Sequence, residues 1–135
     1  MARIIFICGA VLGGLSVAAG SFGAHSLKGL LEANGQSANW ETAVRYCLFH
    51  AVVLLVVAIT AALPQAQGLR GLLHTAGWSF LLGTLIFSGC LALLALSGMK
   101  WLGAIVPIGG VLLLVGWALL AAVGFQLSAA GSPAE

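Results

Sequence analysis

Most of the side chains in this chain that could do chemistry are gathered between residues 20 and 56. They include a carboxylate, a phenol, two imidazoles and two cationic groups. Four of them form two pairs spaced four residues apart, a spacing that places both members of a pair on one face of a helix. The members of this polar cluster are His25, Lys28, Glu41, Arg45, Tyr46 and His50.

Three kinds of chemistry are open to the polar cluster. In a structural interpretation, Glu41 pairs with Arg45 and Tyr46 with His50, so that the side chains satisfy one another. In a second, the histidines and Glu41 handle protons, an ion or a small ligand, since histidine titrates near physiological pH. In a third, His25, Glu41 and His50 hold a metal ion, although ligands so far apart in sequence are not a specific signal.

Enzymatic motifs do not accompany the cluster. The sequence contains no nucleophile–base motif, phosphate-binding loop or dinucleotide fingerprint. Its only acids are Glu32, Glu41 and Glu135, which leaves few candidates for general acid–base work. The sequence therefore does not support an enzyme, and it predicts no metal or other cofactor.

The composition places the polar cluster in a membrane protein. Of the 135 residues, 61% are hydrophobic and 6% are charged, whereas soluble domains carry about a quarter charged residues. So few charges cannot solvate a globule of this size, and the partner predicted for most of the surface is the lipid bilayer. The net charge of +2 is too small to indicate nucleic acid.

Four apolar runs are long enough to cross a bilayer as helices. The first run exceeds the usual core of a signal peptide and three more follow it, so we read it as a retained helix. The predicted fold is an all-α integral membrane four-helix bundle in one domain, residues 1–127, with a flexible tail at 128–135. The predicted spans are residues 4–24, 43–63, 71–96 and 102–125.

The longer connection at residues 25–42 predicts a short interfacial helix, in which Lys28 and Glu32 pair at i, i+4. Ser37 or Asn39 could cap the next helix and place Glu41 in its first turn. The first span ends and the second begins on one membrane face, so the cluster is expected to converge there. His50 then falls about two turns into the second span, near the headgroups.

Orientation follows from the basic residues beside the spans. The connections after the first and third spans carry Lys28 and Lys100, together with Arg45 if it is counted with the connection rather than the helix, against Arg3 and Arg70 on the other side. The positive-inside rule favours cytoplasmic placement of the side with more Lys and Arg. The prediction is therefore that both termini lie outside.

Small residues recur at every fourth position of the first span, a pattern that lets helix backbones approach closely in lipid. Gly9, Gly13 and Gly20 belong to these rows. They predict either packing within the bundle or an interface with a second copy or another membrane protein. A similar row in the third span contains Ser88, which would join the polar cluster if the cluster surrounds one wet pocket.

The fourth span begins with the motif "GAIVPIGG". Pro107 suits the first turn of a helix, where its missing N–H is not needed. The alternative is a broken helix lining a cavity, with Gly109 and Gly110 adding freedom beyond the proline.

Several segments together resemble a known family. "GSFGAHSLK", "WETAVRYCLFHA", "FSGCLALLALSG" and "LGAIVPIGGVLLLVGWALLA" are similar to the domain-of-unknown-function 423 family, small four-span proteins of the bacterial inner membrane. The resemblance runs over about residues 5–122 and implies membrane location and topology rather than an activity. The motif residues of the family correspond here to Gly23, His25, Tyr46, His50, Ser88, Gly89, Pro107, Gly109, Gly110 and Trp117.

The leading functional hypothesis is a non-enzymatic, multi-pass inner-membrane protein that binds or passes a small ligand or ion at its polar cluster. The alternative is a structural or accessory subunit of a membrane complex. The alternative is supported by the rows of small residues and by the scarcity of candidate catalytic residues in a short chain.

Overall fold

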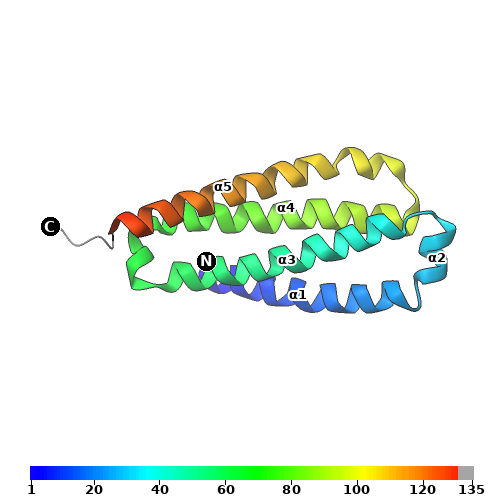
Figure 1. Ribbon diagram of the computed structural model, residues 1–135, viewed down its shortest axis with the longest axis horizontal. Helices are drawn as coiled ribbons and strands as arrows, with labels where there is room; N and C mark the ends of the chain where they lie inside the picture. The colour runs from blue at the N-terminus through cyan, green and yellow to red at the C-terminus, as the bar shows by residue number, and fades with distance from the viewer. Residues whose placement is uncertain (131–135) are drawn as a thin grey trace.

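The four apolar runs of the sequence are the four long helices of the molecule (Figure 1). The computed structural model describes residues 1–130, and in them four helices are long and apolar enough to cross a membrane. A short helix lies between the first two, as the sequence predicts. The α-helices are α1 Ala2–Ala24, α2 Lys28–Ala33, α3 Ser37–Ala62, α4 Arg70–Ser97 and α5 Val106–Ala130, and 3-10 segments cover Pro64–Leu69 and Lys100–Ala104.

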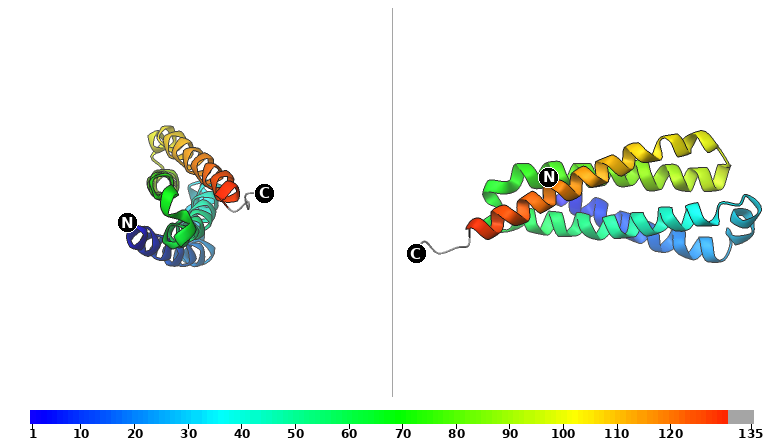
Figure 2. Two further views of the ribbon diagram at one scale, coloured as in Figure 1. Left: turned by 90° about the vertical axis from the view of Figure 1, so that its left-hand side faces the viewer. Right: turned by 45° about the horizontal axis from the view of Figure 1, so that its top comes forward.

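The helices pack in chain order, as the end view in Figure 2 shows. α1 packs on α3, α3 on α4, and α4 on α5, so α3 and α4 are central and α1 and α5 are outer. The fully buried side chains include Leu54 and Val57 of α3 with Leu73 and Phe80 of α4. Large apolar side chains of the outer helices are exposed, Phe125 at 78%, as expected for a surface that faces lipid.

The start of α3 differs from the sequence prediction. The helix begins at Ser37, six residues before the predicted span and slightly before the start that a cap at Ser37 or Asn39 would give, and the stretch from there to Ala62 contains no glycine or proline to interrupt it. Its N-cap is Gln36, without a side-chain cap bond, so neither Ser37 nor Asn39 caps the helix. Since α3 starts earlier, Glu41 falls in the second turn rather than the first.

The small-residue row of α1 is used within the chain. A Cβ atom built on Gly9 would lie 2.9 Å from the carbonyl oxygen of Ala51, and one on Gly20 would lie 3.5 Å from a methyl of Val44. Gly13 likewise faces Ala51. These glycines let α1 approach α3 closely, which is the first of the two predicted uses, packing within the bundle.

Of the two interpretations of the start of the fourth span, the helix start at Pro107 is the one present and the broken helix is not, because α5 runs without interruption from Val106 to Ala130. Pro107 is its second residue, where the missing N–H has no helical partner to lose. Gly109 serves packing instead, because a Cβ there would lie 2.5 Å from the backbone nitrogen of Phe87. Gly110 lies in the same helical turn. Of the predicted C-terminal tail, residues 128–130 continue α5 and residues 131–135 lie outside the described part.

The short helix α2 lies across one end of the bundle (Figure 1). Its Leu31 is buried, and the side-chain amide of Asn34 donates to the Ala95 carbonyl of α4 at 3.3 Å. The predicted pair of Lys28 with Glu32 is present, with nitrogen and oxygen 3.9 Å apart. Gly35, at φ +63°, then takes the left-handed turn that leads the chain into α3.

Candidate functional site

The residues of the polar cluster are distributed over three places rather than one. Lys28, Glu41 and Arg45 line a groove at the α2 end, whereas Tyr46 and His50 face α4 and α5. Ser88 lies in a separate pocket between α1, α3 and α4. With Ser37 as the first residue of α3, His50 lies thirteen residues, or about 20 Å, along the helix. His50 therefore lies near mid-helix and not near the headgroups.

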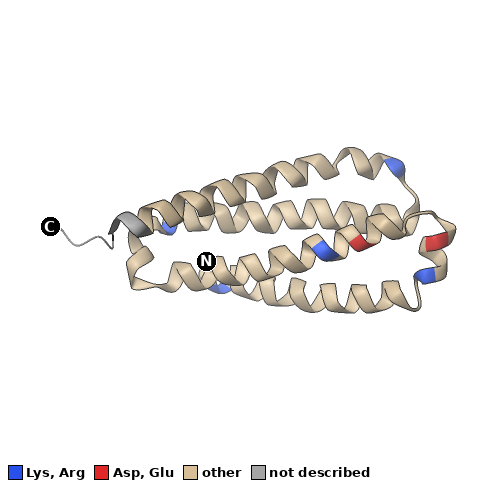
Figure 3. Ribbon diagram, in the orientation of Figure 1, with Lys and Arg blue, Asp and Glu red and all other residues tan. Residues whose placement is uncertain are grey.

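The interfacial groove is formed where α1 ends, α2 crosses the bundle and α3 begins. Its volume is about 640 Å³. Both acidic segments drawn in Figure 3 lie toward this end of the molecule. The walls combine charged groups with apolar ones, a composition suited to the boundary between water and hydrocarbon. They include Gly20, Gly23, Lys28, Leu31, Glu32, Trp40, Glu41, Val44, Arg45 and Leu48.

Glu41 and Arg45 both line the interfacial groove, one helical turn apart, and both are exposed. The predicted ion pair between them is not formed. Among the described residues the one ion pair within 4.0 Å joins Lys28 to Glu32. Both of those side chains are well exposed, so that pair contributes little to stability. The groove thus presents a carboxylate and a guanidinium that are free of ion pairs within the described chain.

His50 is satisfied on both sides of its ring. Its Nδ1 lies 2.8 Å from the Tyr46 carbonyl oxygen, and the indole Nε1 of Trp117 lies 3.4 Å from its Nε2. A carbonyl can only accept and an indole N–H can only donate, so Nδ1 carries the proton and Nε2 accepts. His50 is thus a neutral imidazole that connects α3 to α5.

Aromatic rings surround this imidazole and complete what we call the His50 cluster. The Tyr46 ring stacks on His50 at a centroid distance of 5.9 Å and on Phe87 at 4.6 Å. Phe80 and Trp117 meet edge to face at 5.4 Å, a favoured geometry for aromatic pairs. The predicted pairing of Tyr46 with His50 is therefore present, through the backbone carbonyl and the ring faces rather than the phenol oxygen. A groove of about 470 Å³ lies beside the cluster, against Pro107 and Gly110.

The three residues of the metal-binding interpretation do not come together in the structure. His25 caps the C-terminus of α1 and is exposed, whereas His50 is buried near the middle of α3. In the part of the chain that the structure describes, no three His, Cys, Asp or Glu side chains come close enough to hold an ion. The structure thus gives His25, Glu41 and His50 separate surroundings.

Two tryptophans have roles that sequence reasoning does not assign. Trp40 is buried between the groove and the bundle, and its indole donates to the Ala19 carbonyl at 3.2 Å. Trp117 donates to His50, as described above. The sequence feature that indicates such a role is the indole N–H itself, which requires a hydrogen-bond acceptor when it lies in an apolar helix. The sequence cannot say which helix supplies that acceptor.

Comparison with known proteins agrees with this membrane architecture. The family model described as "Protein of unknown function (DUF423)" matches residues 19–110. The UPF0382 membrane protein SH2409 of Staphylococcus haemolyticus is 38% identical over 118 residues, which cover 87% of this chain and 92% of the relative. This chain belongs to the DUF423 family, also called UPF0382.

Other members of the DUF423 family align over the same extent. The UPF0382 membrane protein YwdK of Bacillus subtilis is 37% identical over 118 residues, covering 87% of this chain and 93% of that protein. No solved structure matches the chain. Membership in the DUF423 family establishes a bacterial membrane protein with four candidate spans.

Proposed function

We propose that this DUF423 protein binds the headgroup of a zwitterionic phospholipid in the interfacial groove. The observation that carries the proposal is the arrangement of Glu41 and Arg45. They are opposite charges one helical turn apart that line the same groove without pairing to each other. A ligand that brings both an ammonium and a phosphate would satisfy both side chains.

The depth order of the two charges supports this class of ligand. Counted from the start of α3 at Ser37, Glu41 lies about 6 Å and Arg45 about 12 Å along the helix. In phosphatidylethanolamine the amine is attached beyond the phosphate, on the side away from the acyl chains. Glu41 would therefore meet the ammonium nearer water, and Arg45 the phosphate nearer the hydrocarbon. A guanidinium recognises phosphate well because its donors match two oxygens at once.

The remaining walls of the groove suit an amphiphile. Lys28 of α2 adds a second cation to the lining of the groove, and Gly20 and Gly23 of α1 contribute no side chains to it. Val44 and Leu48 line the groove with apolar surface, against which the upper part of an acyl chain could lie. A small ion alone would leave this apolar wall unused.

Native mass spectrometry of the purified protein tests the proposal by counting retained lipids after exposure to phosphatidylethanolamine or phosphatidylglycerol. The wild type should retain phosphatidylethanolamine in preference to phosphatidylglycerol. Arg45→Gln should weaken retention of both lipids about tenfold, since hydrogen bonds to charged groups contribute about 1.5–3 kcal/mol. Glu41→Gln should remove the preference, because only one of the two lipids carries an amine.

Matched controls come from charges outside the proposed contact. Arg70→Gln removes an exposed cation at the start of α4, and Arg3→Gln removes an exposed cation at the start of α1; neither residue lines the interfacial groove. Neither substitution should change the lipid preference. The proposal fails if Arg45→Gln and Arg70→Gln have the same effect.

A further inference from the structure

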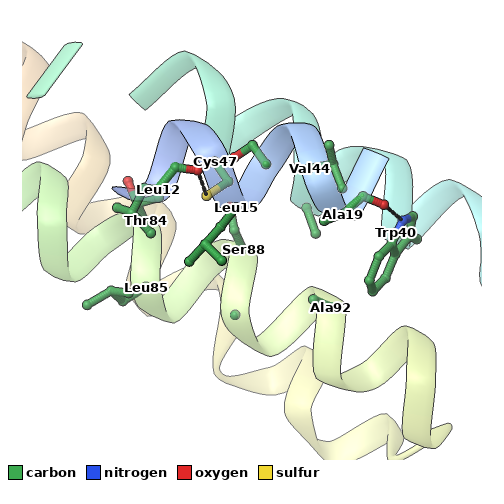
Figure 4. A pocket seen from close by; sticks show the side chains of 13 residues that line it. Leu12, Leu15, Ala19, Trp40, Val44, Cys47, Thr84, Leu85, Ser88 and Ala92 are labelled. Atoms are coloured by element: carbon green, nitrogen blue, oxygen red, sulfur yellow. Dashed lines mark hydrogen bonds between the residues drawn. The ribbon is translucent and has the colours of Figure 1, made fainter. Parts of the chain in front are cut away.

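A second cavity, the Ser88 pocket, lies between α1, α3 and α4 and adjoins the interfacial groove at Trp40 and Val44, which line both. Its volume is about 180 Å³. Thr84, Ser88 and Ala92 follow one another along α4 on one wall, and Trp40 lies beyond them at one end (Figure 4). The opposite walls are built mainly of apolar side chains. They include Leu12, Leu15, Ala19, Ala43, Val44 and Cys47.

The hydroxyl of Ser88 has no partner in this pocket. Ser88 is 6% exposed, and its oxygen is the one buried side-chain N or O atom of the described chain without a hydrogen bond. A buried polar group without a partner is costly. Six other Ser and Thr hydroxyls of the described helices avoid that cost by donating to the carbonyl four residues earlier. They are Ser16, Thr42, Thr60, Thr75, Thr84 and Ser97.

The other polar side chains of the pocket have already used their donors. Ser16 donates to the Leu12 carbonyl at 2.8 Å, and Thr84 to the Phe80 carbonyl at 2.6 Å. The Cys47 thiol points to the same Leu12 carbonyl at 3.9 Å. No charged side chain lines the pocket. Ser88 therefore offers one neutral donor inside an apolar cavity, which selects a neutral apolar molecule carrying an acceptor oxygen.

The size of the pocket limits the molecule to about one ring. An apolar cavity of about 150 Å³ engineered into another protein binds benzene, and the Ser88 pocket is slightly larger. Leu15 and Leu85 line the pocket and are 58% and 50% exposed. They flank a mouth between α1 and α4, two helices that contact each other little. A molecule dissolved in the bilayer could enter there.

The depth of Ser88 decides which oxygen it can meet. Ser88 is nine residues, or about 14 Å, from the end of α4 at Ser97. A helix of 28 residues is about 42 Å long and exceeds a 30 Å hydrocarbon core by about 6 Å at each end. Ser88 therefore lies about 8 Å below the hydrocarbon boundary, beyond the ester carbonyls of phospholipids. We propose that the Ser88 pocket binds a single carbonyl-bearing ring, of the aromatic ketone or quinone type, whose oxygen accepts a hydrogen bond from the Ser88 hydroxyl.

A pair of probes that differ only at the oxygen tests this site. Acetophenone carries the carbonyl, and α-methylstyrene replaces it by an isosteric methylene group. Binding to the full-length protein in lipid nanodiscs is measured by ligand-observed NMR, with empty nanodiscs subtracted. Wild type should bind acetophenone about fivefold more tightly than α-methylstyrene, the effect of one hydrogen bond. Ser88→Ala should remove that difference and leave binding of the hydrocarbon unchanged.

Control variants separate the hydroxyl from the cavity. Ser79→Ala removes another buried serine of α4 that does not line the pocket, and it should retain the fivefold preference. Gly89→Leu should fill the pocket and abolish binding of both probes. Equal binding of both probes to wild type and Ser88→Ala would reduce the site to an apolar void and overturn the proposal, as would no binding at all.

A lipid extract of protein purified from bacterial membranes distinguishes the two sources of such a ring. If the natural occupant is the ring of a prenyl lipid, a carbonyl-bearing lipid should co-purify with wild type and be depleted in Ser88→Ala. If the site takes a free small molecule, the extract contains no such lipid while the NMR preference for acetophenone remains.

Discussion

The interfacial groove and the His50 cluster are each built around a pair of polar residues of α3. The two pairs differ in whether the rest of the protein supplies them with partners. Glu41 with Arg45 and Tyr46 with His50 are both i, i+4 pairs on one helix, α3. The first pair stays open and its charges find no ion pair in the described chain. The second is closed, with both ring nitrogens of His50 bonded.

Depth and neighbours account for the difference. Glu41 and Arg45 point into a groove that α1 and α2 only partly cover, so water and headgroups can solvate them. His50 lies about one and a half turns deeper than Arg45 and two and a half turns deeper than Glu41, where α4 and α5 cover the helix. An unsatisfied imidazole at that depth would be costly, and Trp117 supplies the donor that removes the cost. Polar residues in this membrane protein therefore have different uses according to whether a neighbouring helix satisfies them.

The largest effect on stability is expected from a substitution that disrupts the contact of α4 with α5 next to the His50 cluster. A methyl group on Gly109 would collide with backbone atoms, the nitrogen of Phe87 at 2.5 Å and the oxygen of Gly83 at 2.9 Å. Gly109→Ala should lower the free energy of unfolding by about 1–3 kcal/mol and separate Trp117 from His50. Denaturant unfolding in mixed micelles measures the change.

Gly14→Ala is the matched control for this substitution, since nothing lies within 4 Å of a Cβ atom at that position. It should leave stability unchanged or slightly raised, because alanine favours a helix over glycine. Equal stability of the two variants would contradict the close packing described for α4 and α5.

A smaller effect on stability is expected from removing only the hydrogen bond between Trp117 and His50. Trp117→Phe keeps an aromatic ring but leaves His50 Nε2 without its donor. The expected loss is about 0.6 kcal/mol, the average for side-chain hydrogen bonds between membrane helices. Trp101→Phe, at an exposed tryptophan outside α5, is the control. Nitrogen-15 spectra of His50 should also show the Nδ1–H tautomer in wild type; a protonated Nε2 would contradict the bond.

The sequence predicts much of the fold and less of the site. Hydropathy and length are enough to place the spans, and the i, i+4 rule identifies the Lys28–Glu32 pair. Hydropathy places the start of the second span at residue 43, whereas α3 begins at Ser37, because polar residues at an interface can be helical or not. Depth counted from residue 43 places His50 near the headgroups, whereas it lies near the middle of α3.

The partners of the site residues depend on contacts between distant segments. Trp117 follows His50 by 67 residues, and only the packing of α4 between them brings the two rings together. Ser88 belongs to a row of small residues, and nothing in that row indicates that its hydroxyl lacks the carbonyl bond that Thr84 makes. Such facts depend on rotamers and helix rotation rather than on spacing.

The smallest effect on stability is expected from the substitution that tests the interfacial groove most directly. Exchanging the two charges, Glu41→Arg with Arg45→Glu, preserves the net charge and the composition of the groove but reverses their order in depth. Because both side chains are exposed, the free energy of unfolding should change by no more than about 0.5 kcal/mol. Lipid retention is then compared by native mass spectrometry. We predict that the exchanged variant folds but loses the preference of the wild type for phosphatidylethanolamine over phosphatidylglycerol; an unchanged preference would contradict headgroup recognition by Glu41 and Arg45.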